Sequence, residues 1–384
     1  MRILHTSDWH IGKVLKGQSR VEEHIAVLRQ LVDIAREQRP DLVVVAGDLY
    51  DTAVPTPDAT RLVTRALSAL RGTGADVVAI AGNHDNGAAL DALRAWADAA
   101  GIVLRGTVRD RPDDHIVTGQ TRDGEPWRLV ALPFLSQRYA IRATEMFDLS
   151  AAEATQTYAD HVGRLLRRLS EGFGGDTVNL VTAHLTVIGG TMGGGERDAH
   201  TIQAYAVPTT VFSPATHYVA LGHLHRAQSI LGPCPVHYSG APLQVDFGEE
   251  ENVSSVTMVE VGTSSAARTR QVPVAAAVPL RTVRGTLDEL SKVDGSEGWL
   301  RVYVRERPRA GLREAVQELL PRALEVRIDP ALVAELAESG QRGTAQRTGR
   351  APGELFADYL TSRGHADPAV SQLFDRLYGE VRTS

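Results

Sequence analysis

Short apolar runs recur along the first two-thirds of the chain, and each of them stops abruptly at a polar residue. The run at residues 42–46, LVVVA, lies between Asp41 and the pair Gly47-Asp48. A continuous Val-rich run of this length indicates a parallel strand that is covered on both faces. Open α/β sheets bind their ligands at the carboxyl ends of such strands, so we expect Asp48 to lie where chemistry takes place.

Four further runs end in the same way. Residues 2–7, 77–81, 178–183 and 218–221 are followed by DWH at 8–10, GNHD at 82–85, His184 and GHLH at 222–225. Between the runs, apolar residues spaced by three and four predict helices at residues 19–38, 55–70, 90–99 and 155–169. Alternating strands and helices predict βαβ units and a largely parallel central sheet.

The pattern changes in the remaining segments. Residues 115–133 alternate around Asp123-Gly124, which predicts a hairpin, and strands near 236–239 and 253–261 close the first domain. Residues 263–277 are small and polar, then Ala-rich, as at a domain boundary. Residues 280–328 are predicted to form strand, helix, strand, helix and strand, and residues 355–378 have helical spacing. We therefore expect a first domain at 1–265, a small α+β domain at 278–330, a linker at 338–353 and C-terminal helices at 354–384.

Composition is that of an ordinary globular protein, with 43% hydrophobic and 23% charged residues in 384. The apolar runs are too short to cross a bilayer and no signal peptide is apparent, so we expect a cytoplasmic protein without membrane contact. The net charge of −6 gives no general attraction to nucleic acid. A polyanion must therefore be held by local patches or by metal ions. The single cysteine, Cys234, excludes an internal disulfide and a thiolate-rich metal site.

The strand ends offer imidazole nitrogens, carboxylates and one amide oxygen, and no sulfur. The residues are Asp8, His10, Asp48, Asn83, His184, His223 and His225. One carboxylate can bridge two cations about 3.5–4 Å apart, a pair that stabilises both reacting oxygens of a phosphoryl transfer. Asp48 is the natural bridge because it ends the central strand. Asp8, His10 and His225 would complete one metal site, and Asn83, His184 and His223 the other. Mixed nitrogen and oxygen ligands favour manganese, iron or zinc over calcium or magnesium.

Each of these residues alone has an ordinary structural explanation. A histidine at a strand end is commonly a hydrogen-bonded loop residue, and an aspartate after glycine is commonly a turn or cap residue. Five such sites at successive strand ends favour a metal centre instead. The glycine-rich segment 189–195 lacks the G-x-G-x-x-G order, so we expect a mobile lid or linker rather than a phosphate cradle.

The order D-x-H, G-D-x-x-D, G-N-H-D, H and G-H-x-H resembles the calcineurin-like metallophosphoesterase superfamily. That resemblance implies an α/β fold of two packed β-sheets flanked by helices around a dimetal centre. Within the superfamily, the chain is similar to the SbcD family of DNA nuclease subunits over essentially its full length. The similarity lies in HTSDWHIGK at 5–13, GDLYD at 47–51, ALGHLH at 220–225 and YSGAP at 238–242. Ala241 stands where a serine is expected.

The resemblance implies that the seven residues bind two divalent ions, manganese above all. It implies that His84 contacts the scissile phosphate and stabilises developing charge or protonates the leaving oxygen, a role suited to a pKa near neutrality. Asp51 stands where some relatives have a histidine, and Asp85 is expected either to orient His84 or to react.

The resemblance also implies an activity and partners. The activity is 3′→5′ exonuclease action on double-stranded DNA ends and endonuclease action on single strands and hairpins, in DNA end processing, repair and recombination. The partner that the resemblance implies is the SbcC ATPase. This chain has no G-x-x-x-x-G-K-[ST] loop of its own, so we expect it not to hydrolyse ATP by itself. Residues 354–378 would dock on SbcC, residues 280–328 would cap DNA, and a homodimer would form within a nucleoid-associated heterotetramer.

Several alternatives remain open on sequence grounds. The C-terminal helices could fold back on their own chain instead of docking on a partner. Arginines of the small domain could form a solvated face or contact DNA; they are Arg301, Arg305, Arg307, Arg309 and Arg313. A phosphatase for phosphoproteins or cyclic nucleotides is disfavoured because GDLYD continues as Thr52-Ala53 rather than Arg-Gly. A non-catalytic DNA-end scaffold is disfavoured because it would not need the complete ligand set.

Overall fold

The computed structural model describes residues 1–109, 111–136, 158–196, 206–335, 352–362 and 368–383. Residues 336–351, most of the predicted linker, lie outside this set, as do residues 155–157 of a predicted helix. The chain divides into two compact units. The first unit comprises Met1–Thr282, Asp294–Arg301 and Leu320–Glu325, and the second comprises Val283–Val293, Val302–Leu319 and Val326–Ser384.

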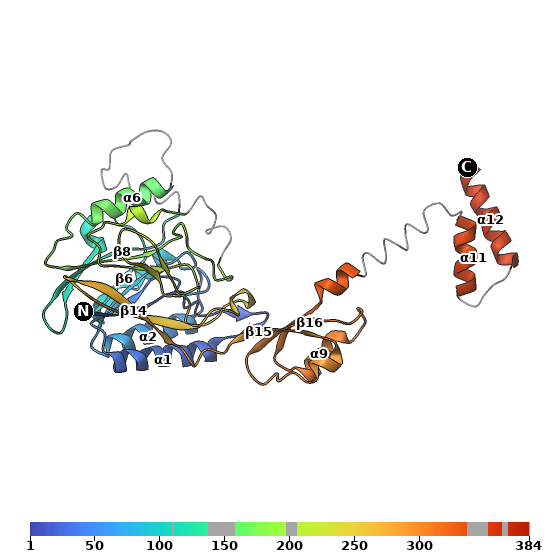
Figure 1. Ribbon diagram of the computed structural model, residues 1–384, viewed down its shortest axis with the longest axis horizontal. Helices are drawn as coiled ribbons and strands as arrows, with labels where there is room; N and C mark the ends of the chain where they lie inside the picture. The colour runs from blue at the N-terminus through green and yellow to red at the C-terminus, as the bar shows by residue number, and fades with distance from the viewer. Residues whose placement is uncertain (110, 137–157, 197–205, 336–351, 363–367, 384) are drawn as a thin grey trace. The chain divides into compact units, whose positions relative to one another are not determined.

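Two six-stranded sheets make up the first unit (Figure 1). Their strand orders are β14-β13-β1-β4-β5-β6 and β11-β12-β10-β9-β8-β7. The first sheet contains β1 (Arg2–Thr6), β4 (Leu42–Val45), β5 (Asp76–Ile80), β6 (Ile102–Arg105), β13 (Ser255–Gly262) and β14 (Ser265–Pro273). The second contains β7 (Ile116–Gln120), β8 (Pro126–Leu132), β9 (Val178–His184), β10 (Tyr218–Gly222), β11 (Gln228–Ile230) and β12 (Val236–Tyr238).

The five strands that end in candidate ligands are divided between the two sheets. β1, β4 and β5 are parallel neighbours in the first sheet, and β9 and β10 are parallel neighbours in the second. The single central sheet expected from the βαβ pattern is therefore wrong, whereas the two packed sheets implied by the family resemblance are confirmed. Hydrophobicity along one strand does not reveal whether a helix or another sheet covers each face, which is why the pattern alone could not separate the two cases.

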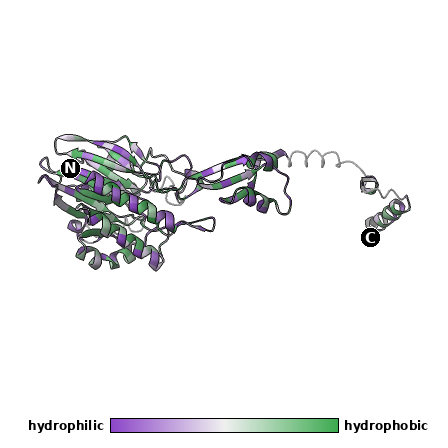
Figure 2. Ribbon diagram, turned by 90° about the horizontal axis from the view of Figure 1, so that it is seen from below, coloured by the Kyte–Doolittle hydropathy of each residue, from purple (hydrophilic) through white to green (hydrophobic). Residues whose placement is uncertain are grey.

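Alternate side chains of β4 belong to different layers of the core. Val43 and Val45 pack with residues of α1 (Val21–Gln38) and α2 (Pro57–Arg71). Leu42 and Val44 belong to the layer between the sheets, with Trp127 of the second sheet. Successive side chains of a strand point to opposite faces, so a strand that is covered on both sides must be apolar throughout. In Figure 2 the helices of this unit accordingly carry both hydrophilic and hydrophobic stretches.

The outer face of the second sheet is covered by α6 (Tyr158–Leu169), whose Val162 and Leu165 are completely buried. Figure 1 shows α6 on one side of the two sheets and α1 and α2 on the other. This four-layer arrangement of helices, sheet, sheet and helix brings the carboxyl ends of both sets of parallel strands to a common region.

The boundaries of several predicted elements differ in detail. The helix predicted at 90–99 starts earlier, as α3 (Gly87–Ala92), because Asn86 caps it, and α4 (Arg94–Ala99) follows after Leu93. The hairpin around Asp123-Gly124 is confirmed as β7 and β8. Part of the segment expected to be a boundary is instead β14, which pairs with β13. β14 is a largely exposed edge strand, so it lacks the apolar signal of the buried strands.

The smaller elements follow the predicted order. β15 (Leu280–Gly285), β16 (Trp299–Val304) and β17 (Ala323–Ile328) form a three-stranded sheet, with α8 (Leu287–Leu290) and α9 (Leu312–Leu319) between successive strands. α11 (Pro352–Ser362) and α12 (Pro368–Thr383) contact each other through Phe356 and Phe374, whose ring centroids are 4.2 Å apart. Within the described part of the chain, no helix is both long and apolar enough to cross a membrane.

Candidate metal centre

The predicted ligands all lie at or just beyond the carboxyl ends of parallel strands. β1 is followed by Asp8 and His10, β4 by Asp48, and β5 by Asn83 and His84, while β9 ends in His184 and β10 is followed by His223 and His225. Each of these side chains is buried, except that Asn83 is half-buried. The two sheets thus deliver the predicted site residues to one buried cluster.

The carboxylate of Asp48 lies between two histidines. Its Oδ2 atom is 3.4 Å from Nε2 of His184 and 3.7 Å from Nε2 of His10. Its Oδ1 atom accepts a hydrogen bond of 2.8 Å from the backbone N–H of His84, which holds the carboxylate so that Oδ2 faces both rings. One carboxylate between two groups of ligands is the geometry that a bridging residue requires.

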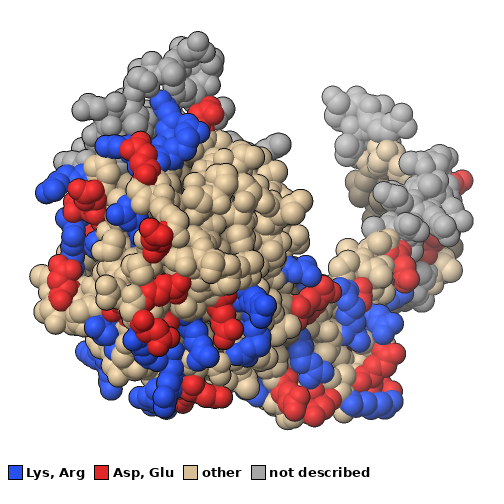
Figure 3. All heavy atoms as spheres, turned by 60° about the vertical axis from the view of Figure 1, so that its left-hand side comes forward, with Lys and Arg blue, Asp and Glu red and all other residues tan. Residues whose placement is uncertain are grey.

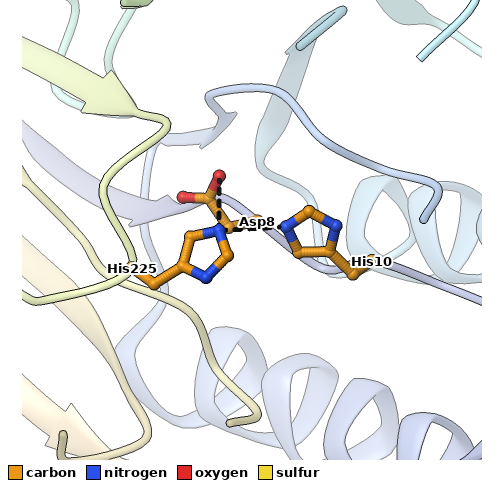
Figure 4. A group of neighbouring side chains, drawn as sticks. All are labelled: Asp8, His10 and His225. Atoms are coloured by element: carbon orange, nitrogen blue, oxygen red, sulfur yellow. Dashed lines mark hydrogen bonds and ion pairs between the residues drawn. The ribbon is translucent and has the colours of Figure 1, made fainter. Parts of the chain in front are cut away.

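One group consists of Asp8, His10 and His225, which Figure 4 shows around a common point. The Nε2 atoms of the two histidines are 3.1 Å apart, and Nε2 of His225 is 4.0 Å from Oδ1 of Asp8. Two ring nitrogens and a carboxylate oxygen that converge in this way can hold one divalent cation. We call this group the first half of the centre.

The second group consists of Asn83, His184 and His223. Oδ1 of Asn83 is 2.9 Å from Nε2 of His184 and 2.7 Å from Nδ1 of His223. Nδ1 of His184 lies 2.8 Å from the carbonyl oxygen of Ala46, so the ring donates its Nδ1 proton there and its Nε2 atom faces Asn83 and Asp48. We call this group the second half.

Asp8 connects the two halves. Its carboxylate accepts hydrogen bonds from the hydroxyl of Ser7 at 2.5 Å and from the backbone N–H of His223 at 3.1 Å. The Ser7 hydroxyl is in turn 2.7 Å from that of Ser239. Ser239 belongs to the YSGAP segment, so this segment supports an anionic residue of the centre, and the adjacent Ala241 does not interrupt the chain of hydrogen bonds.

Burial and mutual charge shift the pKa values of these groups in opposite directions. Burial raises the pKa of Asp8 to about 6 and lowers that of His10 well below its ordinary value. Burial opposes ionisation of Asp48 and His184 as well, but their attraction for each other is stronger. It holds the pKa of Asp48 well below its ordinary value and raises that of His184 to about 9. Such a cluster of buried anions and histidines fits a divalent cation, which would take the place of the protons.

The backbone is strained where it presents these side chains. Asp8, His10, Asp48 and His223 have positive φ angles of 54°, 46°, 52° and 102°. Among the described residues, only two other non-glycine residues share this feature, at positions 16 and 39. Positive φ is rare for side chains with a Cβ and costs about 1–3 kcal/mol per residue, and it gathers at functional sites. The fold therefore tolerates strain to point these four residues inward.

Two motif glycines are explained by the closeness of neighbouring loops. A Cβ atom on Gly47 would lie 2.2 Å from Nδ1 of His184, and one on Gly82 would lie 2.1 Å from Oδ1 of Asp48. No side chain fits at either distance. The glycine of each motif thus makes room for a candidate ligand that comes from a different strand.

His84 lies beside the cluster, with 7% of its surface exposed. Its Nδ1 atom is 2.8 Å from the carbonyl oxygen of Asp51, and its ring centroid is 4.6 Å from that of His10. The carboxylate of Asp85, which we expected to orient His84 or to react, accepts hydrogen bonds from the backbone N–H groups of Leu49, Tyr50 and Gly82. Asp85 thus ties the GNHD loop to the GDLYD loop, and the backbone of Asp51 holds the His84 ring.

Two carboxylates next to His225, the buried Glu249 and the half-buried Glu196, were not anticipated from the sequence. Oε1 of Glu249 is 2.6 Å from Nδ1 of His225, and Oε1 of Glu196 accepts a hydrogen bond of 2.9 Å from the backbone N–H of the same residue. Glu196 also accepts from the backbone N–H groups of the glycines at 193–195. The described part of the glycine-rich segment therefore packs against the first half, and residues 197–205 lie outside the described residues.

Comparison with known proteins agrees with this geometry. Residues 1–227 match the family model described as calcineurin-like phosphoesterase. The fold and the centre therefore define a calcineurin-like phosphoesterase, which is a metal-dependent phosphodiester hydrolase.

Three similar proteins identify a particular family within this class. A protein of Bacillus subtilis, named as the SbcD subunit of the SbcCD nuclease, is 33% identical over 326 residues, which cover 82% of this chain and 81% of that protein. Proteins of the same name from Rhodobacter capsulatus and Escherichia coli K12 are 34% and 32% identical, over 77% and 76% of this chain and 77% and 72% of theirs. The chain belongs to the SbcD family of nuclease subunits, as its motifs predicted.

Proposed function

We propose that this chain is a manganese-dependent DNA nuclease and the nuclease subunit of an SbcC–SbcD type complex. It would act as a 3′→5′ exonuclease on double-stranded ends and as an endonuclease on single strands and hairpins, in DNA end processing, repair and recombination. The observation that carries this proposal is the position of Asp48 Oδ2, 3.4 Å from His184 and 3.7 Å from His10, between two complementary groups of ligands.

In this proposal the seven clustered side chains hold two divalent ions, three in each half and Asp48 between them. When bound, the pair of ions would activate water and neutralise the charge that develops on the phosphate oxygens. In this proposal His84, whose ring contacts that of His10, would face the bound phosphodiester. Because the Asp51 carbonyl fixes its ring, His84 can present Nε2 to the scissile phosphate or to the leaving oxygen.

The distribution of charge supports phosphate binding at the centre itself. On the face of the protein drawn in Figure 3, basic and acidic side chains are interspersed around a broad uncharged area. This face, together with the net charge of −6, indicates little long-range attraction to DNA. Two metal ions in a buried cluster would therefore supply most of the positive charge that a phosphodiester meets.

The partner assignment rests on the names of the relatives and on the C-terminal helices. Apolar side chains of α11 and α12 are exposed, including Tyr359 at 54%, Leu373 at 50% and Leu377 at 52%. Exposed apolar residues on a helix pair are typical of a docking surface. Leu373→Asp and Leu377→Asp should weaken co-purification with a co-expressed SbcC-type ATPase. They should leave manganese-dependent turnover of bis-p-nitrophenyl phosphate unchanged.

The nuclease proposal is tested by incubating the purified chain and manganese with end-labelled hairpin and duplex DNA. We expect opening of the hairpin and shortening of duplex strands from their 3′ ends, both abolished by chelation. Turnover of bis-p-nitrophenyl phosphate that duplex DNA does not inhibit would instead favour a phosphatase for smaller substrates. Absence of any turnover in the metal-loaded chain would favour a scaffold and overturn the proposal.

A further inference from the structure

The side chain of Glu249 lies directly behind His225, on the far side of the ring from the other ligands. It is 1% exposed and comes from the short 3-10 helix at Phe247–Glu249. Oε1 lies 2.6 Å from Nδ1 of His225, and Oε2 accepts a hydrogen bond of 2.8 Å from the backbone N–H of Val245. Each carboxylate oxygen therefore has its own donor.

The position of this carboxylate is enclosed on the opposite side by the glycine-rich segment. A Cβ atom on Gly195 would lie 1.8 Å from Oε1 of Glu249, and one on Gly194 would lie 2.5 Å from the carbonyl oxygen of Gly248. Glu196 holds the backbone N–H of His225 from the same segment. The ring of His225 is thus held by the buried carboxylate of Glu249, and its main chain by the half-buried carboxylate of Glu196.

The contact decides which nitrogen of His225 carries a proton. An ionised carboxylate only accepts hydrogen bonds, so Nδ1 must carry a proton, and Nε2 is the nitrogen that a cation can take in exchange for its proton. Nε2 is the atom that lies 3.1 Å from Nε2 of His10 and 4.0 Å from Oδ1 of Asp8. In metalloproteins, a carboxylate behind a ligating histidine fixes its tautomer and ring orientation and increases its basicity.

We propose that Glu249 is a positioning residue for the first half of the centre and sets the affinity of that half for its cation by fixing the ring of His225. The inference rests on the metal centre of the proposed function. It concerns a residue that does not itself reach the cation, since His225 lies between them. The acidic group acts on the metal through a single histidine.

The two hydrogen bonds make Glu249→Gln a sharp probe. A carboxylate accepts from both Val245 and His225, whereas an amide has one oxygen and must turn its NH₂ group toward one of the two donors. The variant therefore loses one contact or forces His225 to place its proton on Nε2, although size and shape hardly change. We expect binding of one of two manganese ions to weaken by about 10–100-fold, the range seen for such supporting residues.

The experiment titrates metal-free full-length chain with manganese by calorimetry and follows coupling of the two ions by electron paramagnetic resonance. In Glu249→Gln we expect one ion to bind as in the unaltered chain and the other to bind weakly. The coupled signal of two ions should then appear only at higher manganese concentration. The exposed neighbour Glu250 provides a matched control, and Glu250→Gln should titrate like the unaltered chain.

A double-mutant cycle separates positioning from a general structural effect. If Glu249 acts through His225, then Glu249→Gln should change manganese affinity little in a His225→Ala background. An equal loss in both backgrounds, or no loss in the single variant, would overturn the inference. Failure of the unaltered chain to bind two manganese ions would instead contradict the proposed function.

If the Glu249→Gln variant does not fold, a measurement on the unaltered chain can still test the inference. In the zinc-loaded chain, nitrogen-15 spectra of labelled histidines should show His225 protonated at Nδ1. A proton at Nε2 would overturn the inference, because Glu249 would then not set the tautomer.

Discussion

Each half of the centre contains two histidines, but the group that hydrogen-bonds to the outer ring nitrogen of the histidine differs between the halves. Behind His225 stands the carboxylate of Glu249, whereas behind His184 stands the carbonyl oxygen of Ala46. Burial lowers the pKa of His225, but Glu249, with smaller contributions from Asp8 and Glu196, raises the pKa to about 10. The corresponding rise for His184 comes from Asp48.

The first half therefore has anionic support of its own, and the second half depends on the shared bridge. Asp8 in the first half is a carboxylate, whereas Asn83 in the second is a neutral amide, which increases the difference. More negative charge around a site favours a divalent cation. We expect the first half to fill at lower manganese concentration than the second, and the following substitutions test the comparison from the largest effect to the smallest.

Asp48→Asn should affect both halves at once. The amide removes the charge that both histidines share, so we expect loss of the second ion and a fall in turnover on the order of 10³-fold, equivalent to about 4 kcal/mol. Metal content and kcat on bis-p-nitrophenyl phosphate measure the effect. Asp58→Asn, at an exposed aspartate of α2, serves as the control. Retention of two tightly bound ions would show that Asp48 is not a bridge.

His84→Ala should leave both halves filled. Because His84 would act on the phosphate rather than on the ions, we expect kcat to fall by about 10²–10³-fold, within the range for general acid–base groups. Manganese stoichiometry by calorimetry should stay unchanged. Turnover equal to that of the unaltered chain would remove His84 from the mechanism.

Gly47→Ala should disturb the second half selectively. The added Cβ would lie 2.2 Å from Nδ1 of His184, so the ring must leave the Ala46 carbonyl. We expect about 10–100-fold weaker binding of the more weakly held ion and little change for the other. Gly124→Ala is a matched control, because Gly124 also has a positive φ, of 85°, and nothing lies within 4 Å of its Cβ position. Weakening of the tightly held ion instead would reverse our assignment of the two affinities.

His5 provides a reference for acid sensitivity outside the centre. Its Nδ1 accepts from the hydroxyl of Tyr218, its Nε2 donates to the carbonyl of Leu221, and burial lowers its pKa to about 3. Below pH 6.5 the unfolded chain takes up a proton that the folded chain refuses. Because the His5 ring stays neutral in the folded protein, it lowers the free energy of unfolding by about 2 kcal/mol between pH 7 and pH 5.

The metal-free His5→Gln variant should show a correspondingly smaller loss of unfolding free energy over the same pH interval. Urea denaturation at the two pH values measures this difference, and manganese affinity at pH 7 should remain unchanged. An identical pH dependence in both proteins would show that His5 is not the source of the acid sensitivity.

Sequence reasoning predicted the members of the cluster because each follows an apolar strand and has a characteristic ligand chemistry. It could not predict that three of the strands belong to one sheet and two to another, since burial on both faces leaves the same pattern in either case. Sequence reasoning also could not predict the role of Glu249, because no local pattern links it to the centre. Its partner His225 is 24 residues away, and no spacing rule joins a short 3-10 turn to a strand end.

Asp8, His10, Asp48 and His223 have a left-handed backbone, which lowers the stability of the folded protein, yet their side chains are needed for activity. Glycine at any of these positions would relieve the unfavourable conformation, yet it would also delete a side chain on which hydrolysis depends. Selection for thermal tolerance alone would therefore tend to inactivate the protein at the very residues that define it.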